Sequence, residues 1–191
     1  MGSAAKDARM YTYSEYLKFD DGFRCEIIDG MIYNMSPAPR TIHQEVLVNI
    51  IYQIGNYFHD KTCKMFFAPF DVRLPKKGEK SSTTTNVVQP DLLVVCDPKK
   101  IDSRGCKGPP DWIIEIISPS TEKKDRRQKF LLYEECGVKE YWIINPDKKI
   151  ISTFLLEKDG LYGSEVVYTG NQIISPSLFI GLNIDLDKVF T

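Results

Sequence analysis

Two carboxylates interrupt segments that are otherwise apolar. Asp91 begins the run Asp-Leu-Leu-Val-Val, and Glu115 lies inside Trp-Ile-Ile-Glu-Ile-Ile. An ionised carboxylate removed from water carries a large free-energy penalty unless it is paired, protonated or bound to a metal. Taken singly, each acid could instead be a strand-end carboxylate in solvent or the partner of a nearby lysine.

Taken together, Asp91 and Glu115 on neighbouring strands, with Glu26 on a third, indicate a shared site. Converging carboxylates repel one another unless a cation lies between them. Oxygen ligands of this kind are preferred by magnesium and manganese. A metal held in this way can activate water and neutralise charge on a phosphoryl oxygen, as phosphodiester hydrolysis requires.

A second group of candidate residues lies on the helix predicted after Glu115. Lys129 follows Asp125 by four residues, so both occupy one helical face, where a surface ion pair is the alternative interpretation. A basic cluster on the same helix could contact nucleic-acid phosphates or simply form a solvated face. Its members are Lys123, Lys124, Arg126 and Arg127, and Lys76, Lys77 and Lys80 form a similar set in a polar loop.

Two further residues are possible site members. His43 begins a long predicted helix, where a polar or capping histidine is the simpler interpretation. Tyr133 follows Lys129 by one helical turn and could border the site, although a core tyrosine is the alternative. We assign Trp142, Tyr141 and Phe154 to the core.

The elements that must position these residues follow from hydrophobic periodicity and turn residues. Apolar residues at helical spacing predict a helix over 41–58, and Ser118 to Thr121 cap a second helix that reaches about Glu135 and ends at Gly137. A short helix capped by Thr12 or Ser14 is expected through Leu17, and Asp185 caps a last turn. Predicted strands cover 24–29 and 31–35 as a hairpin, 64–74 with a bend at Pro69, 91–95, 112–117, 140–144, 150–156 and 164–168.

This order of elements predicts an α/β (mixed α+β) fold, with a central mixed sheet flanked by helices and an N-terminal β-hairpin. The length of 191 residues fits one domain, which we place at 10–191. Residues 1–9 are interpreted as a tag remnant or a disordered N-terminus.

Composition limits the possible functions. The net charge of −1 shows no global basic field, so any nucleic-acid contact must use local patches. Five scattered cysteines without a C-x-x-C pair argue against a zinc site or a disulfide framework and favour reduced thiols in the cytoplasm. We expect no signal peptide and no membrane span, and the chain has no P-loop or dinucleotide-binding fingerprint.

The ordered set of motifs resembles a known family. Pro90-Asp91 followed by Glu115 in a hydrophobic strand is similar to the PD-(D/E)XK nuclease superfamily. The wider set resembles the Uma-type restriction-endonuclease-like family from about Tyr11 to Phe190. Its motifs are Glu26-Ile-Ile-Asp-Gly30, Met35-Ser-Pro37, His43, Gln89-Pro-Asp91-Leu-Leu-Val-Val95, Glu115-Ile-Ile-Ser-Pro-Ser-Thr121, Asp125, Lys129, Tyr133 and Gly137-Val-Lys-Glu-Tyr-Trp142.

The resemblance implies a restriction-endonuclease-like core in which Asp91 and Glu115 bind Mg²⁺ or Mn²⁺. It also implies that the Ile116 carbonyl adds a ligand and that Glu26 orients the site or its water. The superfamily pattern has a lysine two residues after the glutamate, where this chain has Ile117. Families of this type use a lysine that has moved to the following helix, which makes Lys129 the candidate.

The leading hypothesis is therefore a metal-dependent nuclease in which Glu26, Asp91, Glu115 and Lys129 are catalytic. Nucleic acid, DNA in the first instance, is the expected substrate, and a homodimer is expected because restriction-like nucleases often need two sites for two strands. The alternative is a catalytically inactive module that keeps the nuclease fold and binds nucleic acid or a protein partner, which Ile117 favours. A hydrolase of another phosphate ester is the third hypothesis.

Overall fold

A computed structural model describes residues 9–20, 22–35 and 38–191 of the chain. Residues 1–8 of the predicted N-terminal remnant and residues 36–37 of the Met35-Ser-Pro37 motif lie outside the described residues. Arg9, which we had assigned to that remnant, forms an ion pair of 2.9 Å with Glu15.

The centre of the molecule is a six-stranded mixed sheet, which confirms the predicted fold class. Strands β9 and β10 are parallel, and the other neighbouring pairs are antiparallel. The strand order is β12 (Val166–Thr169), β11 (Ile150–Leu155), β10 (Glu140–Asn145), β9 (Trp112–Ile116), β6 (Leu92–Val95) and β3 (Lys64–Phe67). Every residue of β6, β9 and β10 is buried, as expected for strands that are covered on both faces.

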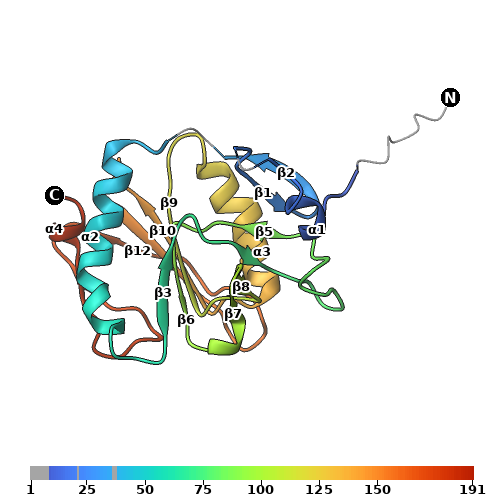
Figure 1. The fold of residues 1–191 in the computed structure, drawn as a ribbon. Coiled ribbons are helices and arrows are strands. Elements are labelled where there is room, and N and C mark those ends of the chain that lie inside the picture. The colour runs from blue at the N-terminus through green and yellow to red at the C-terminus, as the bar shows by residue number, and fades with distance from the viewer. Residues whose placement is uncertain (1–8, 21, 36–37) are drawn as a thin grey trace.

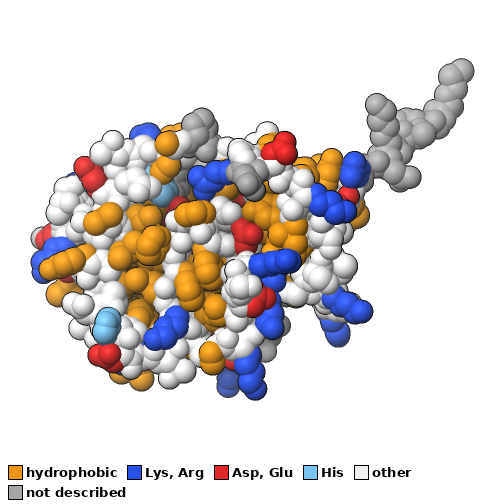
Figure 2. All heavy atoms as spheres, in the orientation of Figure 1, with side chains coloured by type: hydrophobic (Ala, Val, Ile, Leu, Met, Phe, Trp, Pro, Cys, Tyr) orange, Lys and Arg blue, Asp and Glu red, His pale blue; other side chains and the backbone are white. Residues whose placement is uncertain are grey.

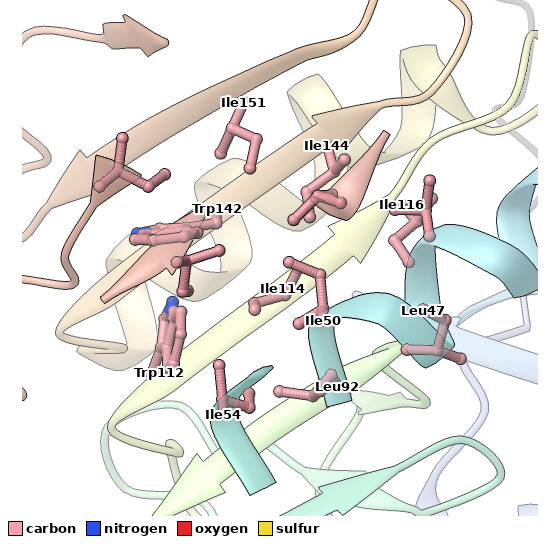
Figure 3. Packing of buried hydrophobic residues seen from close by; sticks show 14 of the residues in the cluster. Leu47, Ile50, Ile54, Leu92, Trp112, Ile114, Ile116, Trp142, Ile144 and Ile151 are labelled. Carbon is pink, nitrogen blue, oxygen red and sulfur yellow. The ribbon is translucent and has the colours of Figure 1, made fainter. Parts of the chain in front are cut away.

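Helices cover both faces of this sheet (Figure 1). Helix α2 (Thr41–Phe58) has the predicted bounds and packs Leu47, Ile50 and Ile54 toward Leu92 and Ile114 (Figure 3). Helix α4 (Leu186–Val189), capped by Asp185 as predicted, packs near α2. The other face is covered by a π-helical segment, η2 (Lys124–Lys129), which continues directly into α3 (Phe130–Cys136). Gly137 ends α3 in the left-handed conformation, with φ 84°.

The predicted N-terminal hairpin belongs to a second six-stranded sheet. Asp29 and Gly30 both have positive φ, as a tight hairpin turn requires, and α1 (Tyr13–Tyr16) packs beside the hairpin. The strand order is β2 (Met31–Asn34), β1 (Cys25–Ile28), β5 (Val87–Val88), β4 (Val72–Arg73), β8 (Gly105–Lys107) and β7 (Ile101–Asp102). The smaller elements are η1 (Pro98–Lys100) and the pair β13 (Ile173–Ile174) and β14 (Ile184–Asp185).

Two predictions about the path of the chain need correction. The strand expected at 64–74, with a bend at Pro69, is two strands, β3 and β4, which lie in different sheets on either side of Pro69, a residue that cannot donate to a strand ladder. The segment between β6 and β9, where we predicted no strand, contains the short strands β7 and β8. Strands this short carry too little period-two patterning to be detected in the sequence.

The expectation that the cysteines are all reduced was wrong. Cys63 and Cys96 form a disulfide, while Cys25, Cys106 and Cys136 are free. Lys64 of β3 faces Val95 of β6 in the antiparallel register, so the residues at the next position, Cys63 and Cys96, face each other as well. Among the described residues, no helix is long and apolar enough to cross a membrane.

Candidate active site

Asp91 lies immediately before β6, at the end of the strand nearest the beginning of α2. One of its oxygens, Oδ2, accepts a hydrogen bond of 2.7 Å from the backbone N–H of Ile116. The same oxygen lies 3.2 Å from Nε2 of His43. These contacts tie Asp91 to the end of β9 and to α2, so the first candidate metal ligand has a fixed orientation.

Glu115 lies in the middle of β9 and is almost completely buried. Its Oε1 atom accepts two hydrogen bonds of 2.7 Å, one from Nζ of Lys129 and one from the hydroxyl of Tyr133. The structure therefore brings the predicted lysine to the predicted glutamate. Tyr133 is both a core residue and a contact of the site, so our two interpretations of it are compatible.

Glu26 joins the site from β1 of the second sheet. Its Oε1 accepts from the backbone N–H of Gln89 at 3.0 Å and lies 2.8 Å from Nζ of Lys129. Its Oε2 lies 2.5 Å from Nζ of Lys124. Lys129 thus bridges Glu26 and Glu115, and it connects the two sheets.

The π-helical turn explains why two lysines reach one glutamate. Lys124 and Lys129 are five residues apart, a spacing that places side chains on different faces of an α-helix. The i→i+5 hydrogen bonding of a π-helix brings such residues to one side, and π segments are frequent at functional sites. Asp125 is buried on the same turn, with Oδ1 3.7 Å from Nζ of Lys129. The expected surface ion pair between Asp125 and Lys129 is therefore an interior contact.

Burial and lysine charge set the protonation of the cluster. Burial raises the pKa of Glu115 to about 8, despite the opposing charge of Lys129. Burial also raises the pKa of Glu26, but the charges of Lys129 and Lys124 outweigh it and the net shift is downward. Among the described residues Glu26 contacts two lysines, whereas Glu115 contacts Lys129 and also feels the charges of Asp125, Asp91 and Glu26, which raise its pKa further. Burial lowers the pKa of Lys129, but Glu115, Glu26 and Asp125 raise it well above its ordinary value, so the amine stays protonated.

His43 responds to the same acidic environment. Burial lowers its pKa, and the hydrogen bond and charge of Asp91 more than offset this, so the net shift is upward. With all groups ionised and His43 neutral, four carboxylates (Glu26, Asp91, Glu115 and Asp125) face two lysines and leave two net negative charges.

The donor atoms fit a divalent cation. Among the described residues, no hydrogen-bond donor is assigned to Oδ1 of Asp91 or to Oε2 of Glu115, so each acid keeps one oxygen for a ligand. No group of three or more His, Cys, Asp or Glu side chains in the described part of the chain is arranged to hold a metal. Mg²⁺ often uses only one or two carboxylates and completes its shell with water and substrate oxygens.

The acids open into a cleft of about 650 Å³. Its floor includes Asp91, Glu115 and Lys129, and its walls come from α2, from the chain after β3, and from the segment between β9 and η2. The cleft therefore links the cluster of acids to the surface of the protein.

The basic cluster does not present one common surface. Lys124 lines the cleft and binds Glu26, whereas Arg126 binds Glu165 at 3.1 Å and Glu122 at 3.6 Å. Lys123 and Arg127 are exposed and do not line the cleft. The sequence analysis did not predict the Lys124–Glu26 contact or the hydrogen bond from the Gln89 N–H to Glu26. The types of the residues reveal neither a π-helical turn nor which backbone N–H groups donate to a side chain.

A mixed sheet covered by helices, with acids converging from three strands, defines a restriction-endonuclease-like fold. The crystal structure of a putative nuclease belonging to DUF820 from Anabaena variabilis shares this fold, with a TM-score of 0.74 at 19% identity over 94% of this chain and 97% of that one. The chain belongs to the Uma2 family, described as putative restriction endonucleases, which matches residues 12–187. An uncharacterized protein from Synechocystis sp. is 27% identical over 149 residues, covering 76% of this chain and 74% of the relative.

Proposed function

We propose that this protein is a divalent-metal-dependent nuclease that hydrolyses phosphodiester bonds of DNA at the Asp91–Glu115 site. The observation that carries the proposal is the position of Lys129, whose protonated amine lies 2.7 Å from Glu115 and 2.8 Å from Glu26 at the floor of an open cleft. Membership of the Uma2 family supports the same chemistry.

Asp91, Glu115 and the Ile116 carbonyl would hold Mg²⁺ or Mn²⁺. When bound, such an ion lowers the pKa of water and neutralises charge on the phosphate. Lys129 donates hydrogen bonds to phosphate oxygens as negative charge grows on them. It does not act as a general base, since its neighbours keep it protonated. Glu26 holds the amines of Lys124 and Lys129 in place.

Calorimetric titration with Mn²⁺ tests the site without a choice of substrate. Wild type should bind the ion, and Asp91→Ala and Glu115→Ala should lose binding while staying folded. Glu45→Ala is the matched control, because Glu45 is an exposed acid of α2 outside the cleft. Cleavage of DNA should then require the ion and both acids, and cleavage retained by a folded Asp91→Ala protein would refute the proposal.

One observation favours a second function, a nuclease-fold module that binds without cleaving. Ile117, at the position where the superfamily pattern has lysine, is buried in the apolar cluster that contains Leu132 and Tyr133. Metal binding by wild type with no cleavage of any nucleic acid would support this module.

The homodimer and the phosphate contacts by Lys123 and Arg127 stay predictions. Light scattering can test the first, and salt-dependent DNA binding can test the second.

A further inference from the structure

The cleft has an apolar half that metal-assisted hydrolysis does not require. On α2, His43, Leu47 and Ile51 recur every four residues and so follow one face of the helix. His43 contacts Asp91, and Leu47 and Ile51 continue the wall away from the acids. Phe67 and Pro69, from β3 and the chain after it, also line the cleft. The cleft therefore has an acidic end and an apolar end.

Phe67 is the clearest feature of the apolar end. It faces Leu92 in the β3–β6 register, and the N–H of the next residue, Ala68, donates to the Asp91 carbonyl oxygen at 3.2 Å. The side chain is nevertheless 52% exposed. Phe67 thus borders the candidate metal site and is not fully packed in the hydrophobic core. Apolar side chains gather across the face that α2 and β3 share (Figure 2).

The chemistry of the two ends identifies the ligand. The acidic end, with a metal, takes a phosphate, and the apolar end takes a flat apolar group attached to it. A nucleobase meets this description, because every base has a face that stacks on aromatic side chains. The volume of about 650 Å³ suits one small-molecule-sized group. A base inside a continuous duplex has both faces covered, so it would have to leave the stack to enter.

We propose that the apolar end of the cleft binds one unpaired nucleobase, stacked on Phe67, from the strand whose phosphate lies at Asp91 and Glu115. The proposal rests on the proposed nuclease function and narrows its substrate to single-stranded or locally unpaired DNA. Arg24 lines the same cleft and supplies positive charge for the adjoining backbone.

Fluorescence anisotropy with a labelled oligothymidylate tests the subsite, measured with Ca²⁺ in place of Mg²⁺ so that a divalent cation is present at the acids while cleavage is suppressed. Phe67→Ala should weaken binding by roughly 5- to 150-fold, the usual effect of losing one stacked base. Phe67→Tyr keeps an aromatic ring and should stay close to wild type. Tyr52→Ala is the control, because Tyr52 is an 82% exposed aromatic residue of α2 outside the cleft. A duplex of equal length should bind more weakly than the single strand.

The outcomes separate this inference from the proposed function. Absence of single-strand binding, equal affinity for duplex and single strand, or a Phe67→Ala effect no larger than that of Tyr52→Ala overturns the subsite. Metal-dependent cleavage that is lost in Asp91→Ala would still support hydrolysis in that case. Conversely, Phe67-dependent binding without cleavage in any metal would support the subsite and refute hydrolysis.

Discussion

Lys129→Met removes a positive charge that contacts both Glu26 and Glu115. The two ion pairs are 2.8 and 2.7 Å long, and the side chains are at most 4% exposed. Removing one partner of a buried pair typically costs about 3–5 kcal/mol. For a domain of this size, each kcal/mol lowers Tm by about 2–4 °C, so the metal-free variant should melt roughly 6–20 °C below wild type. Because burial raises the pKa of Glu115, this side chain can become neutral when Lys129 is removed. The loss of stability should therefore lie toward the lower end of that range.

Although metal-free Lys129→Met should be less stable than wild type, its stabilisation by Mn²⁺ should not be smaller. The substitution frees Oε1 of Glu115 from a competing cation. Mn²⁺ should therefore stabilise the variant at least as much as it stabilises wild type, which is about 2.7 kcal/mol at a hundred times Kd. Cleavage should nevertheless fall by roughly 100- to 1000-fold, as expected when one preorganised donor to the transition state is lost.

Thermal unfolding with and without Mn²⁺, followed by a cleavage assay, measures both effects. Lys123→Met is the matched control: an exposed lysine six residues earlier, expected to stay within about 0.5 kcal/mol of wild type. Smaller stabilisation of Lys129→Met by Mn²⁺ would show that Lys129 organises the acids and does not compete with the metal. Undiminished cleavage would remove Lys129 from the chemistry.

Three other predictions follow from contacts of the site and of the sheet. Burial raises the pKa of Glu115 to about 8 from 4.5, and the pKa values of Asp125 and His43 are also raised, so the free energy of unfolding of metal-free protein should fall as the pH rises from about 4.5 to 8. Urea titrations across that range should show this fall and a larger Mn²⁺ stabilisation at the alkaline end; a rise in metal-free stability would contradict it. Tyr133→Phe leaves Oε1 of buried Glu115 without one donor and should cost about 1–3 kcal/mol in thermal unfolding, and an unchanged Tm would show that this hydrogen bond contributes little. Reduction, or Cys63→Ser, opens the cross-link between positions 33 residues apart and should cost about 3–4 kcal/mol on a chain-entropy basis, so urea midpoints that do not respond to reductant would argue against the disulfide.

Much of the central sheet and its helices was predictable, since periodicity and burial act locally in the chain. The helix over Thr41–Phe58 and the buried strands around Asp91 and Glu115 follow directly from apolar spacing. A carboxylate inside an apolar strand also signals a site, because its burial needs compensation. These features require no knowledge of which strands pair.

What could not be predicted depends on register and on irregular backbone. Cys63 and Cys96 are far apart in sequence, and only the pairing of β3 with β6 makes them neighbours. The second sheet consists largely of two- to four-residue strands, whose pairing is set by tertiary contacts. The contact of Lys124 with Glu26 depends on the π-helical turn, which α-helical spacing does not anticipate.

The replacement of the expected lysine by Ile117 has a structural counterpart on the same strand. Residues two apart on a β-strand share a face, so Glu115 and position 117 both project toward η2 and α3. Ile117 packs there with Leu132 and Tyr133, which draws this helix against the face that carries Glu115. The same packing brings Nζ of Lys129 to Glu115 from the helix side. A positive charge at Glu115 is therefore retained, and Ile117 contributes to the packing that delivers it.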